Sequence, residues 1–373
     1  MMNRNRGLSM IELLVGLAIG SFIIVGAVMV YSQTRSTYAM NETQARLQEN
    51  GRYALAIIEP DLQLAGYYGY SNNAMDFRYM SGGTETPVSK TEQVDAALAG
   101  LPAAGSLCGN NFVVDLLMSV QGSNDAIGPI ATCAPPTAAG MNAGAYFTGT
   151  DGLGTDTLTI RRSSTADAPA ASAAYIQLYL NALKRSNQYV FSAAPAGAPG
   201  VADATHKIRN LIVRTYYVAQ NARTRAGFPT LWRKSLDSNA GVPTVIDEEI
   251  LPGVEDFQVM FGLDTGDHDT VVGIDVDEDK NNVPDNPNGV VSRWVMPDSN
   301  LMNPPTHPTP GISAQIVAVR VWLRIRADAT EVGYTDDRQY AYAGKVYTPA
   351  AAEANVRRIL VSRTVYLRNA RTL

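Results

Sequence analysis

"RGLSMIELLVGLAIGSFIIVGAVMVYS", residues 6–32, contains a single acid at the edge of a long apolar run. The run from Leu13 to Tyr31 has nineteen residues without a charge, which is long enough to cross a bilayer as an α-helix. Glu12 lies directly before this run, although a carboxylate carried into hydrocarbon costs roughly 2–4 kcal/mol. The stretch therefore predicts a membrane helix, and the presence of Glu12 at its edge needs a physical explanation.

The composition narrows the class of protein. A chain of 373 residues is long enough for an anchor plus one large or two modest domains, and its net charge of -5 gives no reason to expect a nucleic-acid partner. The three histidines, His206, His268 and His307, form no paired metal-binding motif. No nucleophile elbow, phosphate-binding loop or dinucleotide fingerprint occurs. These observations favour a protein that is not an enzyme.

The first residues predict the orientation of the helix. The segment from Met1 to Gly7 carries Arg4 and Arg6 and no acid, a pattern that keeps this end in the cytoplasm. After the apolar run there is no small-residue cleavage site of a secretory signal peptide, and the helical character continues. On hydropathy alone, an uncleaved signal anchor followed by a stalk is favoured.

Gly7, Leu8 and Glu12 stand in the order G-L-x-x-x-E before the apolar helix. This arrangement resembles the type IV prepilin signature. The resemblance implies that a prepilin peptidase cuts after Gly7 and methylates the new amine of Leu8, where the family more often has Phe. It also implies that Glu12 meets the amine of a neighbouring subunit in a filament, so that each charge neutralises the other away from water.

A second block, "GRYALAIIEPDLQLAGYYGY" at 51–70, resembles the end of the long helix in PilW-type minor pilins and in the related J-type pseudopilins of type II secretion. We expect the long helix to start at Leu8 and Gly66 to be a helix stop. Pro60 is expected to kink this helix or to end it at Glu59. Three residues continue the apolar stripe: Leu55, Ile58 and Leu62.

Strand patterns follow along the rest of the chain. We predict strands at 156–162, 208–219, 230–236, 314–327 and 357–369, with the second and third forming a hairpin. In 314–327, one face carries Val317, Val319, Val321, Leu323 and Ile325, and the other carries Arg320, Arg324 and Arg326. This alternation predicts an antiparallel sheet with one solvated face.

The stretch "LPGVEDFQVMFGLDTGDHD", 251–269, and the terminal "TVYLRN" also resemble PilW-type proteins. The resemblance implies an α+β pilin fold, in which a long amino-terminal helix packs on an antiparallel sheet with long loop insertions.

Two cysteines, Cys108 and Cys133, lie in the region from Ser71 to Thr155, where periodicity fails and we expect long surface loops. In an oxidising compartment the cysteines could form a disulfide that stabilises the fold by roughly 3–4 kcal/mol. Two unrelated buried thiols are the alternative.

An acidic loop, 264–288, contains eight acids and one lysine. Six of its residues match the ligand positions of a calcium loop: Asp277, Asp279, Asn281, Val283 through its carbonyl, Asp285 and Asn288. Because Asn288 replaces the usual bidentate Glu, a weak Ca²⁺ site is predicted. The alternative is a solvated acidic loop without metal.

We expect five segments: a leader (1–7), a transmembrane and filament-core helix (8–34), its amphipathic continuation (35–66), a loop-rich region (67–155) and a β-rich globular region (156–373). The resemblance implies a minor pilin that initiates type IV pilus assembly and sits near the pilus tip, with roles in adhesion and twitching motility. The implied partners are other minor and major pilins, a tip adhesin, the prepilin peptidase and the inner membrane.

The resemblance implies that the protein first lies in the bacterial inner membrane, with its amino terminus in the cytoplasm and its body exposed to the periplasm. On assembly it would move to the pilus tip at the cell surface. Two alternatives remain open. One is a J-type pseudopilin of a type II secretion system, and the other is an uncleaved, membrane-anchored, calcium-dependent adhesion module.

Overall fold

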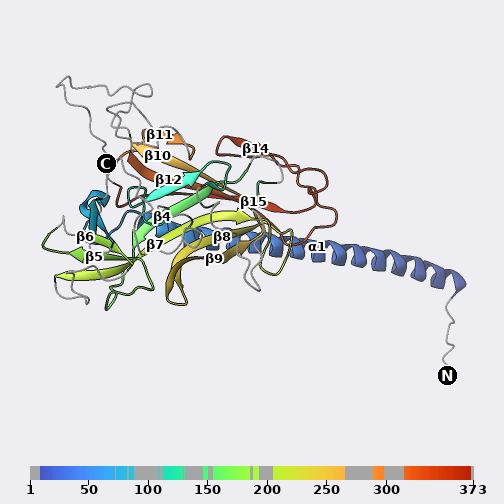
Figure 1. Cartoon of the computed structure of the whole chain (residues 1–373). Coiled ribbons are helices and arrows are strands. Elements are labelled where there is room, and N and C mark those ends of the chain that lie inside the picture. The colour runs from blue at the N-terminus through green and yellow to red at the C-terminus, as the bar shows by residue number, and fades with distance from the viewer. Residues whose placement is uncertain are drawn as a thin grey trace, which may run out of the picture. The chain divides into compact units, whose positions relative to one another are not determined.

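The computed structural model describes residues 9–71, 73–81, 84–87, 108, 112–128, 130, 146–149, 154–184, 188–192, 205–264, 289–297 and 315–370 (Figure 1). The chain forms two compact units, Met1–Glu49 and Asn50–Leu373, which we call the first and second unit. The fold is α+β, as predicted, and the described residues form one long helix and three β-sheets.

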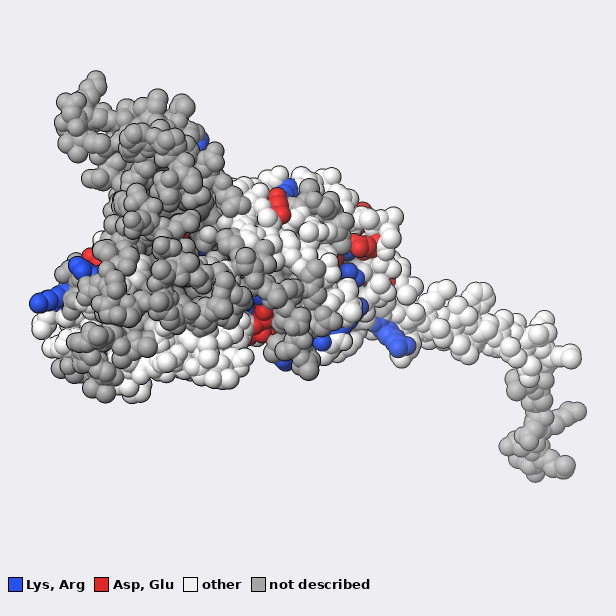
Figure 2. Space-filling model, viewed as in Figure 1, with Lys and Arg blue, Asp and Glu red and all other residues white. Residues whose placement is uncertain are grey.

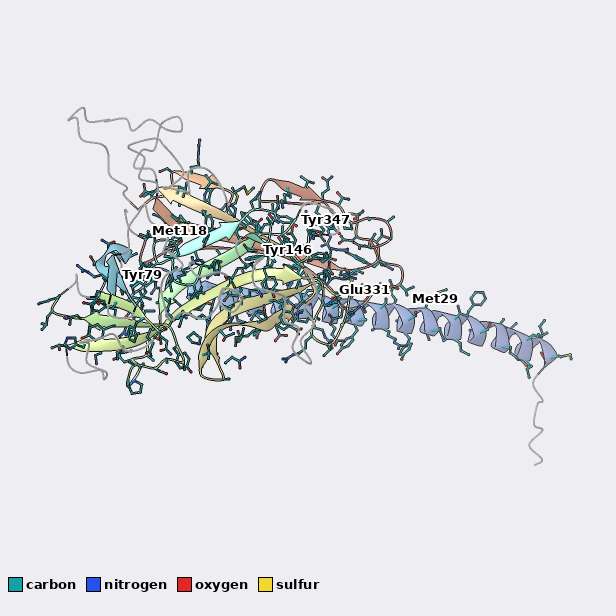
Figure 3. The ribbon with its side chains drawn as sticks, viewed as in Figure 1. Met29, Tyr79, Met118, Tyr146, Glu331 and Tyr347 are labelled. Carbon is teal, nitrogen blue, oxygen red and sulfur yellow. The ribbon has the colours of Figure 1, made fainter. Side chains whose placement is uncertain are left out.

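The long helix α1, Met10–Gln63, begins in the first unit and continues into the second, which starts at Asn50. An 18-residue window of it has a mean hydropathy of 2.7 and no buried residue, so this helix is long and apolar enough to cross a membrane. Met29 shows how its apolar side chains stand free of the helix (Figure 3). The amino-terminal part of α1 is almost entirely white in Figure 2, as expected because residues 13–34 contain no Lys, Arg, Asp or Glu.

The end of α1 differs from the prediction. The helix passes through Pro60 and ends at Gln63, and the Leu64 N–H still donates to the Pro60 carbonyl over 3.2 Å. The expected end at Glu59 is therefore wrong, because proline removes only its own N–H and leaves the remaining bonds of the last turn intact. The predicted stop at Gly66 is confirmed by its φ of 71° and by its N–H, which donates to the Arg161 carbonyl.

The larger sheet of the second unit has nine strands in the order β2-β1-β6-β5-β7-β4-β3, with β8 paired to β7 and β9 paired to β8. Their bounds are β1 Phe77–Ser81, β2 Thr84–Pro87, β3 Val120–Ser123, β4 Thr157–Ser163, β5 Gln177–Asn181, β6 Gln188–Phe191, β7 His206–Ala219, β8 Thr230–Asn239 and β9 Val242–Pro252. The predicted β7–β8 hairpin is confirmed.

Two features of this sheet correct the sequence-based picture. The pair β1–β6 is parallel, so the sheet is mixed and not purely antiparallel. In addition, β1, β2 and β3 lie in the region where we expected long surface loops, and Val113, Val114 and Leu116 from the same region are fully buried in the core. These elements were not predicted because short strands between turn-rich segments show little hydrophobic periodicity.

The smaller sheet has the order β11-β10-β12-β15, and all of its pairs are antiparallel. Its strands are β10 Val254–Asp264, β11 Arg293–Val295, β12 Gln315–Arg326 and β15 Arg358–Tyr366. A separate two-stranded hairpin joins β13, Tyr340–Tyr342, to β14, Lys345–Tyr347.

One face of the smaller sheet packs in the core, as the alternation in 314–327 predicts. Val319, Leu323 and Ile325 are completely buried. The part of α1 in the second unit buries Ala54, Ile58 and Leu62 along one stripe. The helix approaches β15 closely, because a Cβ added at Gly51 would lie 2.8 Å from a methyl carbon of Val361.

The opposite face of this sheet is largely covered, contrary to the prediction of a solvated face. Arg324 on β12 is 0% exposed, and its guanidinium carbon lies 3.4 Å from the ring centroid of Tyr347. Residues 328–357, which include the β13–β14 hairpin and which we call the cover segment, place Tyr340, Tyr342 and Tyr347 in a buried aromatic cluster against this sheet. Of the three predicted face arginines, only Arg320 and Arg326 keep partial exposure.

Candidate functional site

The amino-terminal end of α1 is closed by a reciprocal cap. The Ser9 N–H donates to the Glu12 carboxylate over 3.0 Å, and the Glu12 N–H donates to the Ser9 hydroxyl over 3.3 Å. This is a capping box, which satisfies two backbone donors that would otherwise lack partners. The S-M-I-E spacing signals it in the sequence, although our prediction did not use it. Gly7 and Leu8, the predicted processing site, lie outside the described residues.

The turns that follow this cap form an apolar surface on all sides. Fifteen large apolar side chains are more than half exposed: Met10, Ile11, Leu13, Leu14, Val15, Leu17, Ile19, Phe22, Ile23, Ile24, Val25, Val28, Met29, Val30 and Tyr31. A surface of this kind requires lipid or other helices around it. Such a surface is suited to insertion of the helix into a membrane and to packing against other helices.

The other end of α1 is anchored by a buried carboxylate that sequence reasoning missed. Asp61 is 1% exposed and accepts hydrogen bonds from Arg162, Arg214 and Tyr216, at 3.0, 2.8 and 2.7 Å. Burial raises the pKa of Asp61, but the Arg214 charge and the Tyr216 hydroxyl oppose it, so that the pKa lies below its usual range. These bonds hold α1 to β4 and β7. An acid on the apolar stripe, three residues after Ile58, was the available signal.

A second buried ionic group lies between the smaller sheet and the cover segment. The Glu255 carboxylate is 0% exposed and meets Arg358 at 2.7 Å, Arg324 at 3.5 Å and Arg326 at 3.5 Å. From the cover segment, the Tyr342 hydroxyl accepts from Arg324 and donates to Asp256. We call Glu255, Asp256, Arg324, Arg326 and Arg358 the charged layer. Apart from Arg326, whose side chain is 19% exposed, these residues are buried, and their role is to hold elements together.

Asp156 joins the two large sheets where β4 begins. Its carboxylate accepts the Asp125 N–H at 3.0 Å and the Val259 N–H at 2.7 Å, and its own N–H donates to Phe257 on β10. Burial raises the pKa of Asp156 to about 7, although both N–H donors and Lys345 oppose the shift. The Asp125 carboxylate, which is paired with Lys345, raises this pKa further.

The free energy of unfolding should therefore respond to pH through Asp156. Between the unfolded value of 3.8 and the folded value of about 7, the folded chain keeps a proton that the unfolded chain has released. The free energy of unfolding then falls as pH rises, by at most about 1.4 kcal/mol per pH unit, and levels off above the folded pKa. Denaturant unfolding of the full chain in detergent should show a shallower slope for Asp156→Asn than for the wild type. Parallel pH curves would contradict this assignment.

The predicted calcium ligands cannot be placed. Asp277, Asp279, Asn281, Val283, Asp285 and Asn288 all lie outside the described residues, so the Ca²⁺ site stays a prediction. Within the described part of the chain, no three His, Cys, Asp or Glu side chains are grouped so as to hold a metal ion.

The cysteine prediction is partly visible. Cys108 is buried and disulfide-bonded. Cys133 lies outside the described residues, so its pairing with Cys108 stays a prediction. The hydroxyl of Tyr79, which is labelled in Figure 3, donates to the Val114 carbonyl. The Tyr68 hydroxyl donates to the Leu116 carbonyl, and the two bonds tie residues 114–116 to the core.

Comparison with known proteins gives two family matches. Residues 215–369, from β7 to just beyond β15, match the family of Type IV Pilus-assembly protein W, and residues 2–28 match the prokaryotic N-terminal methylation motif. A solved structure, a type IV-like pilin from Thermus thermophilus, shares 11% identity, with 58% of this chain and 79% of that chain covered and a TM-score of 0.25. That likeness is too weak to support an argument. No curated protein matches the chain.

Proposed function

The chain matches PilW-type type IV pilins in a PilW domain and carries a prepilin signature, and from this premise we propose that it is a minor pilin. In this role it helps to initiate type IV pilus assembly and sits near the pilus tip. Both matches point to a structural protein. The methylation motif and the apolar helix are consistent with anchoring in a membrane.

The observation that carries the proposal is the continuity of α1. A single helix begins at the Ser9–Glu12 cap, exposes apolar side chains for about six turns, and ends at Gln63, just after the buried Asp61. The chain therefore joins an apolar helical segment, which is suited to packing in a filament, to a folded β-rich unit. This is the arrangement that a fibre subunit needs.

The size of the second unit supports a place near the tip. It contains a nine-stranded and a four-stranded sheet together with a cover segment, which makes it too bulky to repeat along a shaft. The proposed partners are other minor and major pilins, a tip adhesin and the prepilin peptidase. Before assembly, the chain would cross the inner membrane once, with its amino terminus in the cytoplasm and the second unit in the periplasm.

Processing of the amino terminus tests the proposal. Mass spectrometry of the protein from native pili should show loss of residues 1–7 and an N-methylated Leu8. Gly7→Val, which places a branched side chain at the cut, should leave the leader in place and keep the chain in the membrane fraction.

Retention of the leader in the pilus fraction would contradict the pilin proposal and favour an uncleaved adhesion module. Deleting the gene separates the remaining alternative. Loss of surface pili with secretion intact supports a minor pilin, whereas loss of secretion with pili intact would indicate a J-type pseudopilin.

A further inference from the structure

The outer edge of the smaller sheet is formed by β15. Among the described strands, β15 pairs only with β12, in a register that runs from Ala318↔Tyr366 to Arg326↔Arg358 without a bulge. The opposite side of β15 is therefore an edge. It is nine residues long.

The register shows which backbone groups point outward from this edge. The Leu367 N–H donates to the Val317 carbonyl and the Ala327 N–H donates to the Arg357 carbonyl, one pair beyond each end of the ladder. In an antiparallel pair the hydrogen-bonded residues recur at every second position. The odd-numbered residues of β15 therefore face β12, and the N–H and C=O groups of the even-numbered residues point away from it.

Most of these outward groups have no partner in the described part of the chain. The Arg358 carbonyl accepts a hydrogen bond from the Arg338 guanidinium at 2.9 Å, which closes one end of the edge. No described residue bonds the outward N–H and C=O of Leu360, Ser362, Thr364 or Tyr366. The Ser362 and Tyr366 side chains are exposed, the latter by 63%, so the edge is accessible.

Of the features that usually protect edge strands, β15 lacks proline, lysine and bulges, and its one exposed charge is Arg363. The sequence of β15, RILVSRTVY, has no Pro or Lys. The edge strand β9 of the larger sheet does have protective features. It carries Pro243 and Pro252, its pairing with β8 has an irregular register, and it contains three consecutive acids. β15 is instead rich in β-branched residues, which favour strand pairing.

The open edge lies along the part of α1 that belongs to the second unit. Gly51 approaches Val361, the Glu59 carboxylate accepts from Arg363 at 2.9 Å, and the Ala65 carbonyl accepts from Asn369 at 3.2 Å. In a fibre of the kind proposed above, the neighbours of this chain are other pilin subunits, so a pilin is the occupant that the proposed function supplies for this edge. The Arg363 side chain is 54% exposed although it is paired with Glu59, so an acidic side chain on a neighbour can approach it from the solvent side.

We propose that residues 360–366 of β15 bind an extended strand from a neighbouring pilin subunit, which joins the smaller sheet as its fifth strand. The inference rests on the proposed function. Main-chain hydrogen bonds to Leu360, Ser362, Thr364 and Tyr366 supply the affinity, and an acidic side chain opposite Arg363 supplies selectivity. The register identifies Ser362 as a suitable position for a test of strand addition, because its N–H points outward and takes no part in the ladder with β12.

The experiment uses the full chain in pilus-producing cells, with a photoreactive benzoylphenylalanine in place of Tyr366. Irradiated pili should contain an adduct between this chain and another pilin. Ser362→Pro should lower its yield at least about fivefold, because it removes one outward donor and obstructs the incoming strand. Ser362→Ala, the matched control, keeps the N–H and should keep the adduct. The same photoreactive residue at exposed Val332 should give none.

Equal adduct yields from Ser362→Pro and Ser362→Ala would overturn strand addition, as would the absence of any Tyr366 adduct in pili that contain the chain. An adduct to a protein that is not a pilin would overturn the proposed donor. If Ser362→Pro does not accumulate to the wild-type level, Thr364→Pro tests the next outward residue. Absence of the wild-type chain from pili is a different result, which refutes the proposed function and the donor together.

Discussion

Replacing Glu255 with glutamine is expected to lower the free energy of unfolding by about 3–5 kcal/mol, because it removes one partner of a buried ion pair. The effect should be large since a single carboxylate serves Arg324, Arg326 and Arg358 at once. Without its charge, two fully buried guanidinium groups lose their closest anion. Asp256 compensates only partly, because burial raises its own pKa and so disfavours its ionised form.

Glu248→Gln is the matched control for this variant. Glu248 also pairs with an arginine, Arg233, but its side chain is 39% exposed. The loss there should stay within about 1 kcal/mol, since water replaces the lost contact. Denaturant unfolding of the full chain in detergent, followed by tryptophan fluorescence, measures both variants. Equal losses would show that the charged layer is no more important to stability than a surface pair.

The charged layer also shows where sequence-based prediction reaches its limit. The alternation along β12 correctly predicted a strand with Val319, Leu323 and Ile325 buried, because a period of two is a local property of the chain. Local alternation cannot tell which element covers the second face. Burial of Arg324 depends on Tyr347, which is more than twenty residues away and in a different sheet.

The candidate sites likewise fall into those that consecutive residues predict and those that depend on distant residues. The cap at Glu12 and the apolar run after it are written in consecutive residues and could be predicted. The anchor at Asp61 needs two arginines about a hundred and a hundred and fifty residues away, and the carboxylate of Asp156 needs a backbone donor from β10. A single sequence gives no measure of such contacts. A charged residue on an apolar stripe remains the best local signal that one exists.

The second large effect is expected at Glu12. Glu12→Ala should insert into the membrane as well as the wild type, since it removes a charge at the edge of the apolar run. Its amount in pili should fall at least about tenfold, because the amine of a neighbouring Leu8 would be left without a counter-charge among apolar helices. Immunoblots of sheared pili, normalised to the washed membrane fraction, measure the ratio.

Alanine at this position also breaks the cap, so a second pair of variants is needed to separate the two roles of Glu12. Glu12→Gln keeps a side chain that can accept from the Ser9 N–H, as glutamine does in capping boxes, but it has no charge. Ser9→Ala keeps the charge and removes the hydroxyl that accepts from Glu12, at a cost of about 1 kcal/mol in helix stability.

If the charge of Glu12 drives assembly, Glu12→Gln should be excluded from pili like Glu12→Ala, and Ser9→Ala should assemble. The reverse pattern, in which Glu12→Gln assembles and Ser9→Ala does not, would make the carboxylate a helix cap alone. The charge is the better explanation, because a cap can be made by a neutral residue, whereas only an anion can neutralise an amine within an apolar bundle. The cap would then serve the chain before assembly, and the same carboxylate would exchange the Ser9 N–H for the neighbouring amine within the fibre.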